Sequence, residues 1–272
     1  PSITAFSIGH FEVRWYSICW CIALALGYMV VYKLYRRQNI PQEKFDPLFI
    51  YCFVGILAGA RLGHCLLYEP GYFLSHPLEM VLPMHHLPDG SWKFTGYAGL
   101  ASHGGTLGLM IALWLYVRRT KVNLMRVLDN IAIATPICAC FIRLGNLMNS
   151  EIVGKFTGSD YGFVFVRNGD TLPRHPGQLY EAIAYFVFFF VGLWLYRRFS
   201  QRVGTGFFFG FCLTSIFAFR FIVEFFKEVQ EPWELAMQHA VGINQGQLLS
   251  IPFIALGLYC MLGGKYCRKL GE

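Results

Sequence analysis

Three arginines lie inside apolar segments that are long enough to cross a membrane: Arg61, Arg143 and Arg220. An arginine near the centre of a spanning helix costs about 2.5–3.5 kcal/mol on insertion scales, so each one needs a partner or a function to persist. The planar guanidinium can donate two parallel hydrogen bonds to a phosphate, and the commonest phosphate near a membrane surface belongs to a phospholipid. The three side chains therefore predict a binding site for a lipid headgroup.

A histidine stands at the start of another apolar segment, where His103 is followed by Gly104 and Gly105. Paired glycines let a backbone or a substrate approach the imidazole closely. Histidine titrates near neutrality and can take a proton as a general base. We therefore expect His103 to be catalytic and Gly104 to contact the substrate.

The segment around Arg143 combines a cation, amides and a carboxylate within a few residues. Arg143 and Asn146 are three residues apart and share a helix face if the helix continues, while Glu151 falls in the loop that follows. Such a group is costly as mere packing at a membrane exit. This spacing favours a functional site.

Structural alternatives exist for several of these residues. Each arginine could snorkel to the interface or pair with a neighbouring helix, and Glu224, four residues after Arg220, is spaced to pair with it. Gly55, Gly59 and Gly63 recur every four residues, which predicts a face that a neighbouring helix can approach closely. The nine cysteines lie mostly in apolar runs without metal-ligand spacing, so we expect core packing and neither a metal site nor a cofactor.

The composition predicts an integral membrane protein. Hydrophobic residues make up 55% of the 272 positions and charged residues only 14%, whereas a soluble domain carries about 25% charge. Apolar windows of about 19 residues predict seven transmembrane helices in an all-α fold. Their ranges are Trp15–Leu34, Leu48–Leu67, Gly99–Tyr116, Val127–Leu147, Leu179–Tyr196, Thr205–Phe226 and Leu248–Leu262.

The basic residues predict the orientation of these helices, because cytoplasmic loops are rich in lysine and arginine. Most of them lie at the ends of the first, third, fifth and seventh spans or after them: Lys33, Arg36, Arg37, Lys44, Arg118, Arg119, Lys121, Arg126, Arg197, Arg198, Arg202, Lys265, Arg268 and Lys269. The N-terminus is then outside and the C-terminus cytoplasmic, and residues 1–272 form one polytopic domain. The net charge of +7 is thus distributed as in a membrane protein and does not indicate nucleic-acid binding.

This orientation places the candidate residues at one depth. The longer loops, about residues 68–98, 148–178 and 227–247, become extracytoplasmic and are expected to form a small head. The three arginines fall in the last third of spans that rise to the outer face, about 6–9 Å below its end at 1.5 Å per residue. His103 and Tyr16 lie near the outer start of descending spans. We expect these side chains to form one site near the extracytoplasmic leaflet.

Several of these stretches together resemble the bacterial prolipoprotein diacylglyceryl transferase family over nearly the whole chain. The family signature is Gly-Arg-x-Gly-Asn-Phe-x-Asn-x-Glu-x-x-Gly. It is matched here by Arg143, Gly145, Asn146, Asn149, Glu151 and Gly154, while Ile142 and Leu147 depart from it. Other similar pieces are Trp15-Tyr16, His103-Gly104-Gly105, the run from Arg174 to Glu181, Phe219-Arg220 with Glu224-Phe225-Phe226, and Gly246-Gln247 with Ser250-Ile251-Pro252. Further departures are Ile216, where members often carry tyrosine, and His64, where an aromatic residue is expected.

The resemblance implies an enzyme of the bacterial inner membrane that acts in lipoprotein biosynthesis. Such enzymes transfer the diacylglyceryl group of phosphatidylglycerol to the lipobox cysteine of a prolipoprotein signal peptide and release glycerol phosphate. By this resemblance Arg143 and Arg220 hold the lipid phosphate, and Asn146 and Tyr16 orient the headgroup. The remaining substrate contacts are expected at Arg61, Gly104 and Gly154. The thiol proton goes to His103 or, as alternatives, to Glu151 or Glu224.

Two other classes of function remain possible from the residues alone. An anion or lipid transporter or channel would use the same buried cations, but it needs a polar route through the cytoplasmic half of the spans, which is poor in charge. A purely structural protein would leave the cluster of His103, Arg143 and Asn146 unexplained.

Overall fold

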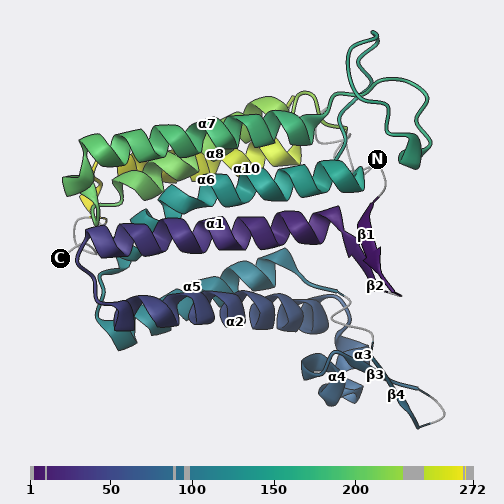
Figure 1. The fold of residues 1–272 in the computed structure, drawn as a ribbon, viewed down its shortest axis with the longest axis horizontal. Helices are drawn as coiled ribbons and strands as arrows, with labels where there is room; N and C mark the ends of the chain where they lie inside the picture. Colours follow the sequence, from purple (N-terminus) through teal and green to yellow (C-terminus); the bar gives the residue numbers. More distant parts are fainter. Residues whose placement is uncertain are drawn as a thin grey trace. The chain divides into compact units, whose positions relative to one another are not determined.

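The computed structural model describes residues 3–9, 11–87, 90–94, 99–228, 242–265 and 267. It is mainly helical, as predicted, with two short antiparallel hairpins in addition (Figure 1). The chain divides into two compact units. One comprises Pro1–Arg37 and Met125–Glu272, and the other comprises Gln38–Leu124. The arrangement of residues 1–272 as a single domain stays a prediction.

Each of the seven predicted spans contains a helix, with ends within a few residues of those expected. The helices are α1 (Trp15–Arg37), α2 (Gln42–Leu67), α5 (Ser102–Thr120), α6 (Leu124–Asn149), α7 (Gly177–Arg198), α8 (Phe207–Val223) and α10 (Gln245–Met261). Within the described ranges, α1, α2, α6 and α7 are long and apolar enough to cross a membrane, and α8 and α10 are shorter apolar helices.

The outward surface of α7 shows why this helix suits a lipid environment. Large apolar side chains recur on it every three or four residues and remain exposed: Ile183, Phe186, Val187, Phe190 and Trp194. A water-soluble protein rarely exposes so continuous an apolar face. The composition of the sequence and the exposure of its apolar side chains therefore agree.

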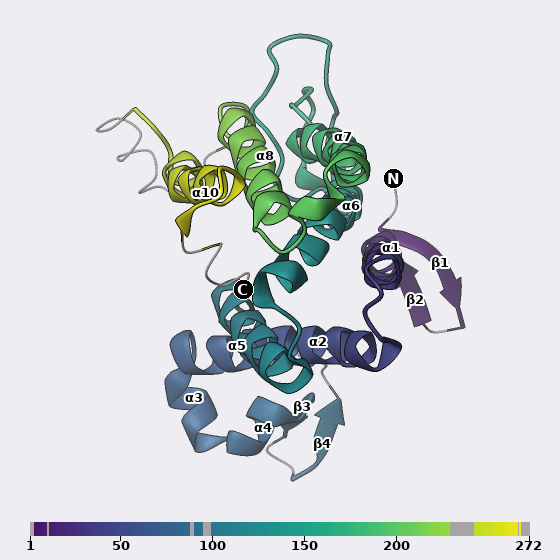
Figure 2. The same ribbon diagram turned by 90° about the vertical axis from the view of Figure 1, so that its left-hand side faces the viewer.

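The core of the larger unit joins helices that are distant in the sequence (Figure 2). Leu34 of α1, Ile133 of α6, Tyr196 of α7 and Phe208 of α8 form one buried cluster. A second cluster, around Cys140 of α6 and Tyr185 of α7, carries the same packing further along these helices. α8 also packs along α10. These contacts place α6, α7, α8 and α10 around the polar residues described below.

A buried carboxylate fixes the beginning of α8 against α6. Asp129 of α6 is fully buried, and its oxygens accept hydrogen bonds from the backbone amides of Gly204 (2.8 Å), Gly206 (3.0 Å) and Phe209 (2.8 Å). Gly204 and Gly206 have φ of 95° and 83°, a conformation that glycine adopts without steric cost. The turn before α8 is thereby tied to the helix that carries Arg143.

Outside the helices, short extended segments cover one end of this unit. β1 (Thr4–Ile8) pairs with β2 (Phe11–Arg14) immediately before α1. Between α6 and α7 the chain passes through a short 3-10 helix, η1 (Val166–Asn168), and a second one, η2 (Ser200–Arg202), follows α7.

The smaller unit is built on close contact between α2 and α5. The predicted small-residue face is confirmed, because Gly55, Gly59 and Gly63 lie directly against α5. A Cβ added at Gly59 would lie 2.8 Å from Cα of Gly108, too close for any side chain. The connection between the helices holds α3 (Pro70–Ser75), α4 (Pro77–Val81) and a hairpin of β3 (Met84–His86) and β4 (Trp92–Phe94).

We expect Asp129→Asn to lower the free energy of unfolding by about 1–3 kcal/mol, because the new amide nitrogen faces backbone N–H groups and leaves buried donors unpaired. Thermal unfolding of the purified protein measures the effect. Asp160→Asn, at an exposed loop position, is the matched control and should leave Tm unchanged. Equal Tm values for both variants would show that the turn before α8 does not depend on Asp129.

Candidate functional site

The site is built on an ion pair between two neighbouring helices. Arg143 lies two turns before the end of α6, and its Nε is 2.9 Å from Oε2 of Glu181 in the second turn of α7. Glu181 is fully buried, so its charge requires cationic partners. The ion pair that compensates the charge of Glu181 therefore also fixes the direction of the Arg143 guanidinium.

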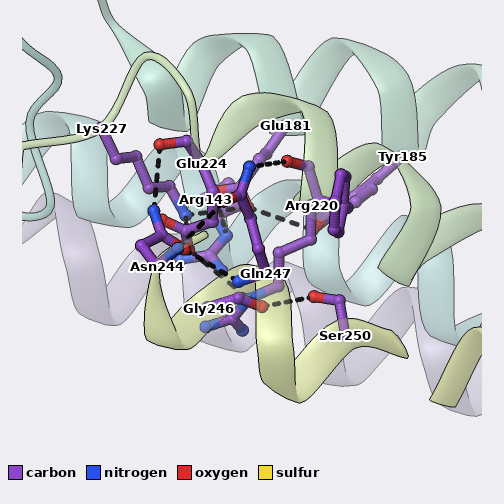
Figure 3. A network of polar contacts seen from close by, with 11 residues as sticks. Arg143, Glu181, Tyr185, Arg220, Glu224, Lys227, Asn244, Gly246, Gln247 and Ser250 are labelled. Carbon is purple, nitrogen blue, oxygen red and sulfur yellow. Dashed lines mark hydrogen bonds and ion pairs between the residues drawn. The ribbon is translucent and has the colours of Figure 1, made fainter. Parts of the chain in front are cut away.

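The pair extends into a network of five charged side chains (Figure 3). Nζ of Lys227 lies 3.2 Å from Oε1 of Glu181 and 3.6 Å from Oε1 of Glu224. The Glu224 oxygen is also 3.8 Å from Nε of Arg220, one turn back at the end of α8. The pairing of Arg220 with Glu224, predicted from their spacing, is thus confirmed. Three cations and two carboxylates leave the network one positive charge in surplus.

The beginning of α10 forms one wall of this network. Asn244 and Gln247 form a reciprocal capping box at the first turn, and Nδ2 of Asn244 also donates to the Glu224 carbonyl at 3.3 Å. Gly246 lies directly against the Glu224 carboxylate, and a Cβ there would collide with it. Glycine at position 246 therefore lets α10 approach the charged cluster (Figure 3).

Another carboxylate, that of Glu151, is held next to Asn146 by amide groups. Nδ2 of Asn146 and Nδ2 of Asn149 each lie 3.0 Å from an oxygen of Glu151, and the side-chain amide of Gln178 donates to the Glu151 carbonyl. NH1 of Arg143 is 3.5 Å from Oδ1 of Asn146, so the two share a helix face as predicted. Glu151 follows the end of α6, also as predicted.

The backbone around Glu151 is strained. Ser150 and Ile152, on either side of it, have φ of 58° and 56°. This left-handed region costs a residue other than glycine about 1–3 kcal/mol, and a β-branched residue such as Ile152 adopts it rarely. The amides that hold Glu151 offset this cost, and they fix its carboxylate beside Asn146.

Tyr16 contacts the same stretch of α6 from α1. A Cβ added at Gly145 would lie 2.9 Å from Cδ2 of the Tyr16 ring, so the ring covers the glycine between Arg143 and Asn146. This glycine permits the close approach of α1. Tyr16 therefore lies against the backbone between the arginine and the amide, and its contact with a headgroup stays a prediction.

Gly154 lies where three extended segments meet. Its amide donates to the His175 carbonyl at 2.9 Å, it bridges to Lys227, and the next amide, of Lys155, donates to the Phe226 carbonyl at 2.8 Å. A Cβ at position 154 would lie 2.7 Å from both the Phe226 oxygen and Cβ of His175. Close backbone packing therefore explains why a glycine stands at position 154. The same packing holds the backbone of Lys227 in place.

The remaining predicted residues belong to the smaller unit. The buried Arg61 donates to the carbonyls of Glu79 (2.7 Å) and Met80 (3.3 Å), and its guanidinium lies 4.7 Å from the Phe73 ring centroid. Its role in binding lipid stays a prediction. His103 is exposed in the first turn of α5, and Gly104 packs against α2.

The contacts of Arg143 and Arg220 leave part of each guanidinium available. Among the described residues, both arginines meet carboxylates through Nε, and Arg143 also lies 3.5 Å from Oδ1 of Asn146 through Nη1 and hydrogen-bonds the Tyr185 hydroxyl. The edge formed by the terminal nitrogens is the one that grips a phosphate bidentately. The larger unit can thus hold an anionic headgroup between oriented cations.

Sequence reasoning overlooked the central roles of Glu181 and Lys227. The signal was nevertheless present in the sequence. Glu181 is an acid inside an apolar segment and needs a cation, while Arg143 has no acidic residue within one helical turn. Across the described part of the chain, no three His, Cys, Asp or Glu side chains are grouped to hold a metal ion.

Comparison with known proteins links the whole chain to one family. The family described as prolipoprotein diacylglyceryl transferase matches residues 3–263. A relative from Bacteroides fragilis named phosphatidylglycerol--prolipoprotein diacylglyceryl transferase is 58% identical over 96% of this chain and 92% of its own length. Relatives with the same name from Tolumonas auensis and Porphyromonas gingivalis are 43% and 42% identical, over 94% and 93% of this chain and 92% and 89% of their own lengths.

We expect Gly154→Ala to lower the free energy of unfolding by about 1–3 kcal/mol, because the new methyl group forces apart backbone segments that cannot repack freely. Denaturant unfolding of the purified protein measures this. Gly177→Ala is the matched control, since a Cβ there meets its nearest neighbours at an ordinary 3.7 Å. A Gly154→Ala protein as stable as the control would show that the three segments are not tightly packed.

Proposed function

The chain belongs to the prolipoprotein diacylglyceryl transferase family, and we propose that it transfers the diacylglyceryl group of phosphatidylglycerol to the lipobox cysteine of prolipoproteins. This reaction is the first step of lipoprotein maturation. The observation that carries the proposal is the charged network in which Glu181 and Glu224 hold Arg143 and Arg220 through Nε. Such a pair of oriented guanidinium groups is suited to a phosphodiester.

In this reaction the cysteine sulfur forms a bond to the terminal glyceryl carbon of the diacylglyceryl group while the bond from that carbon to the phosphate oxygen breaks. Glycerol phosphate leaves with the electron pair, so negative charge grows on the phosphate. Guanidinium groups that are already oriented stabilise this charge without reorganising. We assign Arg143 and Arg220 to the phosphate, and Asn146 and Tyr16 to the orientation of the headgroup.

The thiol proton needs an acceptor. Both oxygens of Glu151 accept hydrogen bonds from amides, and Glu224 is paired with two cations, so both carboxylates already have partners within the site. His103 is exposed and forms no hydrogen bond or ion pair with the described residues. We therefore assign proton removal to His103, and a cation beside the thiol would favour the thiolate.

The proposal includes a membrane topology. Seven spans, with the N-terminus outside and the C-terminus cytoplasmic, place the ends of α6 and α8 at the outer leaflet of the bacterial inner membrane. The excess of basic residues after every second helix supports this orientation. The lipid donor and the prolipoprotein then reach the site from the extracytoplasmic side.

The proposed function is tested with purified protein in vesicles that contain phosphatidylglycerol, incubated with a peptide bearing a lipobox cysteine. Mass spectrometry should show the peptide gaining one diacylglyceryl group on its cysteine. The same peptide with serine in place of cysteine is the control and should gain nothing. Absence of the mass gain with the cysteine peptide would contradict the proposed function.

We expect Arg143→Lys to lower kcat/KM for phosphatidylglycerol by roughly 10-fold or more. Lysine keeps the charge but loses the planar fork, and a hydrogen bond to a charged group contributes about 1.5–3 kcal/mol. Initial rates at varied phosphatidylglycerol content measure the loss. Arg197→Lys, at the exposed end of α7, is the matched control. Unchanged kcat/KM in Arg143→Lys would rule out bidentate phosphate binding at that residue.

A further inference from the structure

We propose that Lys227 is a positioning residue that sets both the orientation and the net charge of the two phosphate-binding arginines. This inference rests on the proposed function, in which Arg143 and Arg220 receive the lipid phosphate. Lys227 touches neither arginine in the described part of the chain and acts through the carboxylates of Glu181 and Glu224.

The geometry makes Lys227 the link between two otherwise separate ion pairs. Among the described residues it is the cation whose charged group meets both carboxylates, at 3.2 Å and 3.6 Å. It engages Oε1 of Glu181, which leaves Oε2 to Arg143. On Glu224, Lys227 and Arg220 share Oε1. Each carboxylate is therefore shared between Lys227 and one arginine (Figure 3). Glu181 is shared with Arg143, and Glu224 is shared with Arg220.

The burial of the network gives this division an electrostatic consequence. The Lys227 side chain is 8% exposed, and those of Glu181 and Glu224 are 0% and 11% exposed, so their charges are poorly screened by water. Without the lysine, two carboxylates would neutralise two arginines. With it, one positive charge remains for an anion to neutralise.

The backbone holds Lys227 at this place. Lys227 pairs with Gly154, and the adjacent Phe226 carbonyl accepts from the Lys155 amide. The carbonyl of Glu224 is bonded to Asn244 at the beginning of α10. Hydrogen bonds therefore hold the segment after α8 to Lys155 on one side and to Asn244 on the other. They fix the position of the Lys227 backbone, from which its side chain reaches both carboxylates.

A simpler reading is that Lys227 only neutralises buried Glu181 and so stabilises the fold. The two readings differ in which kinetic constant changes. A residue that only stabilises the fold alters the amount of folded enzyme, and so lowers the apparent kcat without changing either KM. A residue that positions the arginines also raises KM for phosphatidylglycerol, because the arginines bind its phosphate before the reaction as well as in the transition state, and it leaves KM for the lipobox peptide unchanged.

The test uses Lys227→Gln, whose amide can still donate to the carboxylates but carries no charge. We expect KM for phosphatidylglycerol to rise about 10-fold, which corresponds to about 1.4 kcal/mol, with KM for the peptide within about 2-fold of the original enzyme. Lys227→Arg restores the charge and should return KM for phosphatidylglycerol to within about 3-fold. Lys155→Gln is the matched control, because the exposed side chain of this lysine contacts a backbone carbonyl, that of Phe225, and no carboxylate among the described residues.

The outcomes separate the inference from the proposed function. An original enzyme that transfers no diacylglyceryl group contradicts the proposed function itself. An active original enzyme with the same KM for phosphatidylglycerol in Lys227→Gln overturns the role of Lys227, as does an equal rise in both KM values. If Lys227→Gln does not fold, Lys227→Arg decides, since a folded arginine variant with KM for phosphatidylglycerol raised more than about 10-fold also overturns it.

Discussion

The larger unit depends on one buried carboxylate. Glu181 is inaccessible to solvent, and its two oxygens face cations from two other segments of the chain, Arg143 and Lys227. Removing one partner from such a buried pair typically costs about 3–5 kcal/mol, because the remaining charge is left uncompensated. The packing of α6, α7 and the segment after α8 is therefore tied to the geometry of the charged side chains. The network shapes the fold as well as the site.

Other polar contacts of the larger unit satisfy backbone groups at helix ends that the apolar helices cannot satisfy alone. Asp129 accepts hydrogen bonds from amides before α8 and in its first turn. At the beginning of α10, Asn244 accepts from the Gln247 amide and donates to the Glu224 carbonyl. In an apolar environment an unpaired amide costs several kcal/mol, so each of these contacts also restricts how the helices can slide. The arginines are thus presented by helices whose ends are fixed.

The sequence predicted helices and contacts correctly wherever the interaction that determines them is local. Hydropathy located the helices because each is a long apolar run, and the spacing of Arg220 and Glu224 revealed their pairing because one helical turn separates them. The glycine face of α2 was evident for the same reason. The partners of Glu181 could not be predicted in this way, since Arg143 and Lys227 lie far from it in sequence. Their meeting depends on how three segments rotate and pack, which periodicity alone does not determine.

Glu181 and Glu151 are held in different ways, and this difference indicates different roles. Glu181 meets cations, so its charge is matched and it serves as an anchor. Glu151 meets the amides of Asn146 and Asn149 and sits between two residues with left-handed backbone conformations. A chain that needed only a counterion for Arg143 could obtain it without this strain, because Glu181 already supplies one. We propose that the strained turn places Glu151 where it contacts the substrate, next to Asn146.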